Sequence, residues 1–176
     1  LSFVGSEERP AVVYNGQDDN FLVVWVEQGA SGKEVWGVRV AGVADGGDGG
    51  GQLIGAKQQL ASKPSADCAP PDVASDRGRN RYGLVYDYYV SGVGTEAQLR
   101  LISAEGEYIA GKQATVNPEG EQPSVAANGD VDQYVVVYKY MGGSGESEVW
   151  AYRTSGDLVG VVNGPLDAPP SGGQVD

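Results

Sequence analysis

Two apolar runs separated by a short polar turn, Pro10-Ala-Val-Val-Tyr-Asn15 and Phe21-Leu-Val-Val-Trp25, decide the fold of this 176-residue chain, because the same pair occurs three times. The other copies are 71–76 with 82–86 and 123–128 with 134–138. In each copy the first aromatic residue follows the proline by 11 positions (10 to 21, 71 to 82 and 123 to 134). Self-similarity of this kind predicts a repeat architecture.

Each repeat continues with two more short apolar segments, so that four strands separated by Gly, Asn and Asp turns are expected per unit. Glu34-Val-Trp-Gly-Val-Arg39 matches Glu148-Val-Trp-Ala-Tyr-Arg153 in the third position. The predicted blades span 10–62, 71–117 and 123–168, with 1–9 as the tail of a fourth strand and 169–176 as the start of a next repeat. The glycine-rich tract 42–51 is interpreted as a loop inserted into the first unit.

Side-chain alternation indicates the kind of all-β protein. Phe21, Val23 and Trp25 share one face of their strand and the leucine and valines between them share the other, so both faces are apolar. A strand of this type must be covered on both sides, as in the stacked four-stranded sheets of a propeller. We therefore expect an all-β chain of three four-stranded β-meander repeats that form an incomplete propeller, with a β-trefoil or β-prism as the alternative.

The repeat resembles those of bacterial extracellular β-propeller proteins. The resemblance is carried by Pro123, Val125, Ala126, Asn128, Tyr134, Tyr138, Trp150, Arg153, Gly156, Leu158 and Gly160. It implies a propeller-type fold and an extracellular or cell-surface location, and its motif brings no catalytic residues with it.

Composition excludes several functional classes. The chain has no His and one cysteine, Cys68, which removes His-based nucleophile systems, His-ligated zinc and an internal disulfide. A net charge of −12 argues against nucleic acid and against anionic membrane surfaces. The longest apolar run, Phe21 to Val26, is far shorter than the roughly 20 residues of a membrane helix, so no membrane insertion is expected.

The turn between the first two strands carries Asn or Asp at two fixed places in every unit. In the third unit Asn128, Asp130 and Asp132 have the spacing of oxygen ligands for calcium. The favoured interpretation is turn chemistry, because Asn and Asp suit tight turns, where their side chains hydrogen-bond the nearby backbone, and no bidentate Glu follows at the EF-hand distance. No other cofactor is expected.

Aromatic residues on the second and third strands are candidates for glycan binding. Trp36 and Trp150 occupy equivalent positions, and Tyr88 and Tyr140 lie on second strands. Exposed rings at these positions would stack on sugars, whereas buried ones would pack between blades.

Three blades do not close a propeller, which typically has about four to eight. Unfinished strands at both ends predict self-association into a homo-oligomeric ring or a filament. The expected function is accordingly a non-catalytic, secreted structural or adhesive repeat protein, with a lectin-like carbohydrate-binding module as the alternative. Glycosidase chemistry is third, because the acids Glu27, Asp87, Glu96 and Glu148 sit in no motif that singles them out.

Overall fold

The computed structural model describes residues 8–29, 32–42, 51–64, 66–92, 94–141, 145–159 and 162–166. Within these ranges the chain forms strands and turns and no helix, and hence no helix that could cross a membrane. The strands are β1 (Glu8–Asn15), β2 (Asn20–Gly29), β3 (Gly32–Ala41), β4 (Leu53–Ala61), β5 (Ala66–Cys68), β6 (Asp72–Asp76), β7 (Arg81–Val90), β8 (Gly94–Ser103), β9 (Tyr108–Asn117), β10 (Gly120–Asn128), β11 (Gln133–Met141), β12 (Ser147–Ser155) and β13 (Val162–Pro165).

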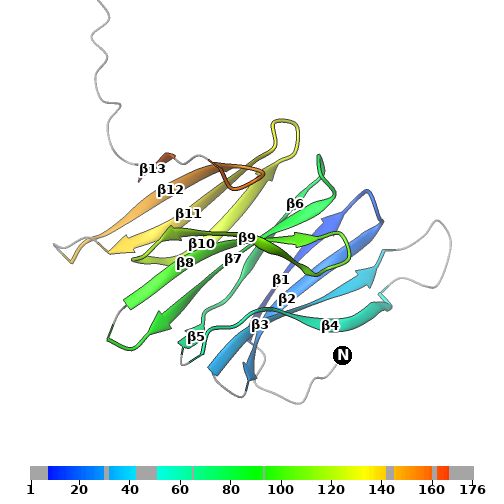
Figure 1. Cartoon of the computed structure of the whole chain (residues 1–176), viewed down its shortest axis with the longest axis horizontal. Helices are drawn as coiled ribbons and strands as arrows, with labels where there is room; N and C mark the ends of the chain where they lie inside the picture. The colour runs from blue at the N-terminus through cyan, green and yellow to red at the C-terminus, as the bar shows by residue number, and fades with distance from the viewer. Residues whose placement is uncertain are drawn as a thin grey trace, which may run out of the picture.

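The strands form three open antiparallel sheets that lie side by side (Figure 1). Blade 1 has the order β1-β2-β3-β4, blade 3 has the order β10-β11-β12-β13, and blade 2 lies between them. In blade 2 both β5 and β6 pair with β7, followed by β8 and β9, so the first strand position is filled by two short pieces. Three stacked meanders confirm the predicted all-β, propeller-blade architecture, and the β-trefoil or β-prism alternative does not describe them.

Two of the predicted segments fall largely beyond the described residues. Residues 1–7 of the expected fourth-strand tail lie outside them, while residues 8 and 9 belong to β1. The expected start of a further repeat, 169–176, also lies outside, as do residues 43–50 of the glycine-rich tract.

The repeated prolines mark irregularities in the first strand of each blade. The pairing of β1 with β2 shifts register around Arg9 and Pro10, and that of β10 with β11 shifts around Gln122 and Pro123. Arg9 and Gln122 have left-handed backbone, with φ of 46° and 52°. Because proline has no N–H to donate to a ladder, it is accommodated at such bulges. In blade 2 the same place is the break at 69–71 between β5 and β6.

The turn after each first strand is built by its Asn and Asp residues. The first of each pair accepts a hydrogen bond from the backbone N–H two residues further on, at 3.0 Å for Asn15, 3.1 Å for Asp76 and 3.2 Å for Asn128. The second of each pair has a left-handed backbone, which Asn and Asp tolerate better than most residues. These are Asp19 (φ 45°), Asn80 (φ 47°) and Asp132 (φ 50°). Turn chemistry therefore accounts for both fixed positions.

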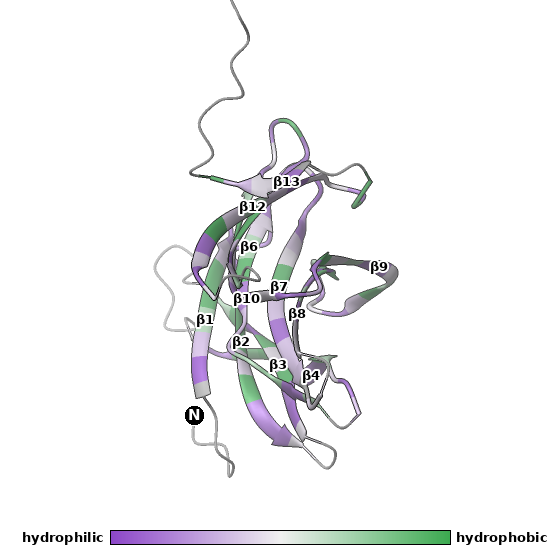
Figure 2. Ribbon diagram, turned by 90° about the vertical axis from the view of Figure 1, so that its left-hand side faces the viewer, coloured by the Kyte–Doolittle hydropathy of each residue, from purple (hydrophilic) through white to green (hydrophobic). Residues whose placement is uncertain are grey.

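Apolar side chains from alternate positions of β7 join the three blades. Tyr82, Leu84 and Tyr86 pack against blade 1, in a core that includes Leu22 and Val24. The intervening positions face the other way, and Val85 belongs to a second core with residues of blade 3. Burial of one such side chain is worth about 1.5–3 kcal/mol, so the two cores carry most of the stability. Figure 2 shows the apolar segments, in green, recurring along the strands of the stack.

Buried tyrosine hydroxyls connect each blade to the turn of the preceding one. The Tyr82 hydroxyl donates to Asn20 Oδ1 at 3.0 Å and accepts from Asn15 Nδ2 at 3.2 Å. In the next blade the Tyr134 hydroxyl donates to Asp76 Oδ2 at 3.2 Å. In blades 2 and 3, the first aromatic residue of the repeat thus donates a hydrogen bond to a polar residue at a strand end of the preceding blade.

Close packing between blades 2 and 3 predicts that a Gly83→Ala substitution destabilises the protein. A Cβ atom at position 83 would lie 2.5 Å from Cε1 of the Tyr134 ring, which is held by the second core. We expect the free energy of unfolding to fall by about 1–3 kcal/mol, as for other overpacked cores. Urea unfolding followed by tyrosine and tryptophan fluorescence measures this loss.

The matched control is Gly164→Ala in β13, because a Cβ atom there meets no other atom within 4 Å. Equal unfolding midpoints for the two variants would show that the blades are not closely packed at Gly83.

Candidate functional site

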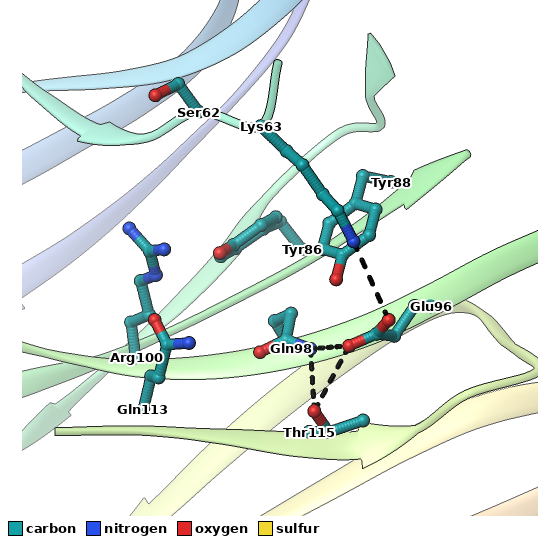
Figure 3. Close-up of a pocket in the computed structure, with 9 residues that line it drawn as sticks. All are labelled: Ser62, Lys63, Tyr86, Tyr88, Glu96, Gln98, Arg100, Gln113 and Thr115. Carbon is teal, nitrogen blue, oxygen red and sulfur yellow. Dashed lines mark hydrogen bonds and ion pairs between the residues drawn. The ribbon is translucent and has the colours of Figure 1, made fainter. Parts of the chain in front are cut away.

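A cavity of about 280 Å³ lies between blades 1 and 2, at the edge of their shared core (Figure 3). Most of its lining comes from one face of β7, β8 and β9, and the remainder from the segment that follows β4. The lining residues are Ser62, Lys63, Tyr86, Tyr88, Glu96, Gln98, Arg100, Gln113 and Thr115.

Strand register explains why these side chains meet. Tyr86 pairs with Gln98, and Gln98 with Thr115, across the three neighbouring strands. Tyr88 pairs with Glu96 one step further along. Alternate residues of a strand share a face, so Glu96, Gln98 and Arg100 of β8 all point toward blade 1.

Three polar side chains form a hydrogen-bonded cluster on the floor of the cavity. The Gln98 amide donates to Thr115 Oγ1 at 2.9 Å and also to Glu96 Oε1. The Thr115 hydroxyl donates to Glu96 Oε1 at 3.1 Å. These contacts hold the Gln98 amide against Glu96 and Thr115.

Tyr88 and Lys63 form one wall. The Lys63 ammonium lies 3.8 Å from the centroid of the Tyr88 ring and 3.9 Å from Glu96 Oε2. Burial raises the pKa of Tyr88, and of Tyr86 beside it, so both phenols stay neutral and can donate hydrogen bonds at physiological pH.

Arg100 stands at the opposite end of the cavity. Its Nη1 donates to the backbone oxygen of Leu60 in blade 1 at 2.8 Å, while its Nε is buried without a hydrogen-bond partner. The guanidinium carbon is 5.6 Å from the Tyr86 ring centroid and 4.8 Å from that of Tyr108. A smaller hollow of about 120 Å³ shares Arg100 and Ser62 and continues along β4.

The four aromatic residues proposed from the sequence for glycan binding are distributed over the three blades. Tyr88 lines the cavity. Tyr140 and Trp150 contact each other in blade 3, with ring centroids 4.5 Å apart, and the Trp150 indole donates to Glu148 at 2.7 Å. Trp36 lies in blade 1 with the Lys57 ammonium 4.6 Å from its ring centroid. The structure therefore does not bring the four into one site.

Two of the three candidate calcium ligands, Asn128 and Asp132, have side chains that are engaged within the protein. Asn128 Oδ1 accepts the backbone N–H of Asp130, and Asp132 forms ion pairs with Arg79 and, at 3.2 Å, with Arg81. A cation at Asp132 would have to displace or outcompete two guanidinium groups. Among the described residues, no group of three His, Cys, Asp or Glu side chains is placed to hold a metal.

The sequence did not single out six residues of this lining, which are Ser62, Lys63, Gln98, Arg100, Gln113 and Thr115. A usable signal was present in β8, where Glu96, Gln98 and Arg100 alternate with the apolar Ala97, Leu99 and Leu101. Polar residues on a strand face that should be covered by a neighbouring blade indicate a place where the apolar contact is interrupted.

A second cavity, of about 240 Å³, lies where the irregular first strands of the blades approach one another, and Asp87 is its acidic residue. The Asp87 side chain is 3% exposed; Oδ2 accepts the Gln122 N–H at 2.7 Å, and Oδ1 has no partner. Burial raises the pKa of this carboxyl group, and the negative charge of Glu121 raises it further. The other lining residues are Arg9, Ala69, Pro70, Pro71, Gln122 and Pro123.

The four acids considered for glycosidase chemistry do not converge. Glu96 and Asp87 line different cavities, and each is the single acidic residue among the described residues that line its own. Glu27 is paired with Lys57, and Glu148 is exposed on blade 3. Glycoside hydrolysis by the usual mechanisms needs two carboxyl groups about 5–9.5 Å apart across the scissile bond.

Comparisons with known proteins support the fold. No family model and no curated protein matches the chain. Among solved structures, it is similar to the Hadza microbial sialidase Hz136, with a TM-score of 0.64, 8% identity and 88% of this chain covered. It is also similar to an exo-β-1,3-galactanase from Phanerochaete chrysosporium, with a TM-score of 0.53, 13% identity and 92% of this chain covered. A GH43 β-1,3-galactosidase matches with a TM-score of 0.53, 11% identity and 90% of this chain covered. The chain spans 36%, 36% and 57% of these three chains.

These comparisons contradict the function expected from the sequence, a non-catalytic structural or adhesive protein that self-associates through unfinished terminal strands. The propellers that the chain resembles are named as a sialidase, a galactanase and a galactosidase, so they act on glycosides. The lectin-like alternative is compatible with them. At 8–13% identity the likeness itself shows the fold alone.

The environment of Asp87 predicts how an Asp87→Asn substitution changes the pH dependence of stability. Because the folded-state pKa is raised above 3.8, the carboxyl group contributes stability that is full below that pH and is lost as the pH rises through the raised value. An amide does not titrate, so the free energy of unfolding of the variant should rise relative to that of the unaltered protein between about pH 4 and pH 7. Urea unfolding across this range measures the difference.

Asp130→Asn is the control, because it removes the same charge at an exposed position and is measured over the same range. A difference that rises no more for Asp87→Asn than for Asp130→Asn would contradict the environment described for Asp87.

Proposed function

We propose that the chain is a carbohydrate-binding part of a β-propeller protein and that the cavity between blades 1 and 2 is its binding site. The observation that carries the proposal is the lining of that cavity, in which amide, hydroxyl, carboxylate and guanidinium groups surround two tyrosines. Sugars present closely spaced hydroxyl groups that each donate and accept, and planar polar side chains match that pattern.

The size and shape of the cavity support this ligand class. At roughly 30 Å³ per water molecule, about 280 Å³ holds about nine waters. A hydroxylated ring can replace such waters and satisfy the same polar groups. The hollow that continues past Arg100 adds about 120 Å³ to this space.

The charge and contacts of the lining favour binding over hydrolysis. Glu96 accepts two hydrogen bonds and faces Lys63, so it acts as an anchor for Gln98 and Thr115. Among the described residues of the lining Glu96 is the one carboxyl group, so the usual pair of carboxyl groups does not meet in this cavity.

A secreted or cell-surface location belongs to the same proposal. Its support is the resemblance of the repeats to those of bacterial extracellular propeller proteins, together with a site suited to glycans, which are abundant on cell surfaces.

The proposal predicts that Gln98→Ala and Thr115→Val each weaken oligosaccharide binding. Loss of a hydrogen bond to a buried polar partner costs about 1–3 kcal/mol, which corresponds to roughly fivefold to a hundredfold in Kd. Screening the protein on an array of neutral and acidic oligosaccharides identifies a ligand, and isothermal titration calorimetry then compares the variants.

Gln28→Ala is the matched control, because Gln28 is an exposed glutamine of β2 that lies outside the cavity. Absence of binding to every oligosaccharide, or equal affinities for the Gln98 and Gln28 variants, would refute the proposed site. Release of shorter sugars during incubation would show hydrolysis in place of simple binding.

A further inference from the structure

The lining of the cavity between blades 1 and 2 carries more positive than negative charge, although the protein as a whole is acidic. The chain carries 24 acidic and 12 basic residues, yet the cavity lining holds two cations, Lys63 and Arg100, and one carboxylate, Glu96. Pockets lined by one sign of charge favour ligands of the opposite sign.

The one carboxylate among the described residues of the lining already interacts with other side chains of the protein. Glu96 Oε1 accepts hydrogen bonds from Gln98 and Thr115, and Oε2 faces Lys63 at 3.9 Å. That separation is at the outer limit of an ion pair, so the Lys63 ammonium keeps capacity for another anion.

Arg100 has no acidic partner among the described residues. Its guanidinium donates to the Leu60 carbonyl oxygen, and the rings of Tyr86 and Tyr108 lie beside it. Arg79 and Arg81, by contrast, each pair with aspartates. A half-buried guanidinium that faces a cavity without a counter-ion is suited to a planar anion, because its N–H groups match the two oxygens of a carboxylate.

Arg100 lies where two hollows meet, so an anionic group bound to it would belong to a ligand that extends into the main cavity. Arg100 lines both the main cavity and the hollow that continues along β4. A sugar in the main cavity would contact the Gln98 and Thr115 cluster, and its carboxylate, or that of the next sugar, would lie toward Arg100.

We propose, on the basis of the carbohydrate-binding function proposed above, that this cavity selects sugars that carry a carboxylate, the uronic acid class. Arg100 is the specificity-determining residue, Lys63 is the second cation, and the Gln98 and Thr115 cluster contacts the hydroxyl groups common to neutral and acidic sugars.

The test compares two trisaccharides of the same linkage, α-1,4-linked galacturonate and α-1,4-linked galactose, by isothermal titration calorimetry at neutral pH. A hydrogen bond to a charged group is worth about 1.5–3 kcal/mol, so the acidic sugar should bind more tightly by about tenfold or more. Arg100→Gln should bring the two affinities to within about threefold by weakening the acidic sugar alone. Lys63→Gln should reduce the preference to a smaller extent.

The control is Arg153→Gln, which removes an exposed arginine of blade 3 and should leave the preference unchanged. Thermal unfolding of each variant identifies any loss of fold, and Lys63→Gln keeps the test informative if Arg100→Gln does not fold. Equal affinities for the two sugars in the unaltered protein would overturn the inference while leaving the proposed function in place. Binding of neither sugar, nor of any sugar on the array, would overturn both.

Discussion

The face-to-face burial of β7 is the constraint on which the rest of the structure depends. Its side chains alternate between two cores: Tyr82, Leu84 and Tyr86 complete the core shared with blade 1, and Val85 contributes to the core shared with blade 3. A central strand with apolar residues on both faces cannot be satisfied within one sheet. The blades therefore stack, and the turns, bulges and tyrosine hydrogen bonds adapt to that spacing.

The cavity is a consequence of where this packing ends. Along β7 the residues that face blade 1 pass from wholly buried Tyr82 to Tyr88 at the cavity, and on β8 the same face carries Gln98 and Arg100. Among the described residues, blade 1 contributes Ser62 and Lys63 of the segment after β4 to this lining, and space of about 280 Å³ remains between the sheets. Polar groups that would be costly in the core lie at this edge, and three of them, Glu96, Gln98 and Thr115, hydrogen-bond one another.

The repeat spacing was sufficient to predict the strands and the all-β blade architecture, because the offset of 11 residues from proline to aromatic is a local property. Burial on both faces was predicted for the strand at 21–26, but Phe21 and Val23 there are only partly buried, and β7 of the middle blade is the strand that is covered on both sides. The same reading favoured turn chemistry for Asn128 and Asp132, which the Asx hydrogen bond and left-handed φ explain. The cavity was not predictable in the same way. Lys63 and Arg100 are 37 positions apart and belong to different blades, so their proximity depends on how blade 2 packs on blade 1. Tyr88 was the one proposed glycan-binding residue that lies in this cavity.

The bond between Tyr82 and Asn20 also has a consequence for synthesis. The two residues are separated by 62 positions, whereas the pairings within blade 1 connect strands that are neighbours in the chain. Translation proceeds at about 5–20 residues per second, so roughly 3–12 s pass between synthesis of the Leu22 face of blade 1 and synthesis of β7, which covers it. During that interval an apolar sheet face is exposed to chaperones and to other nascent chains.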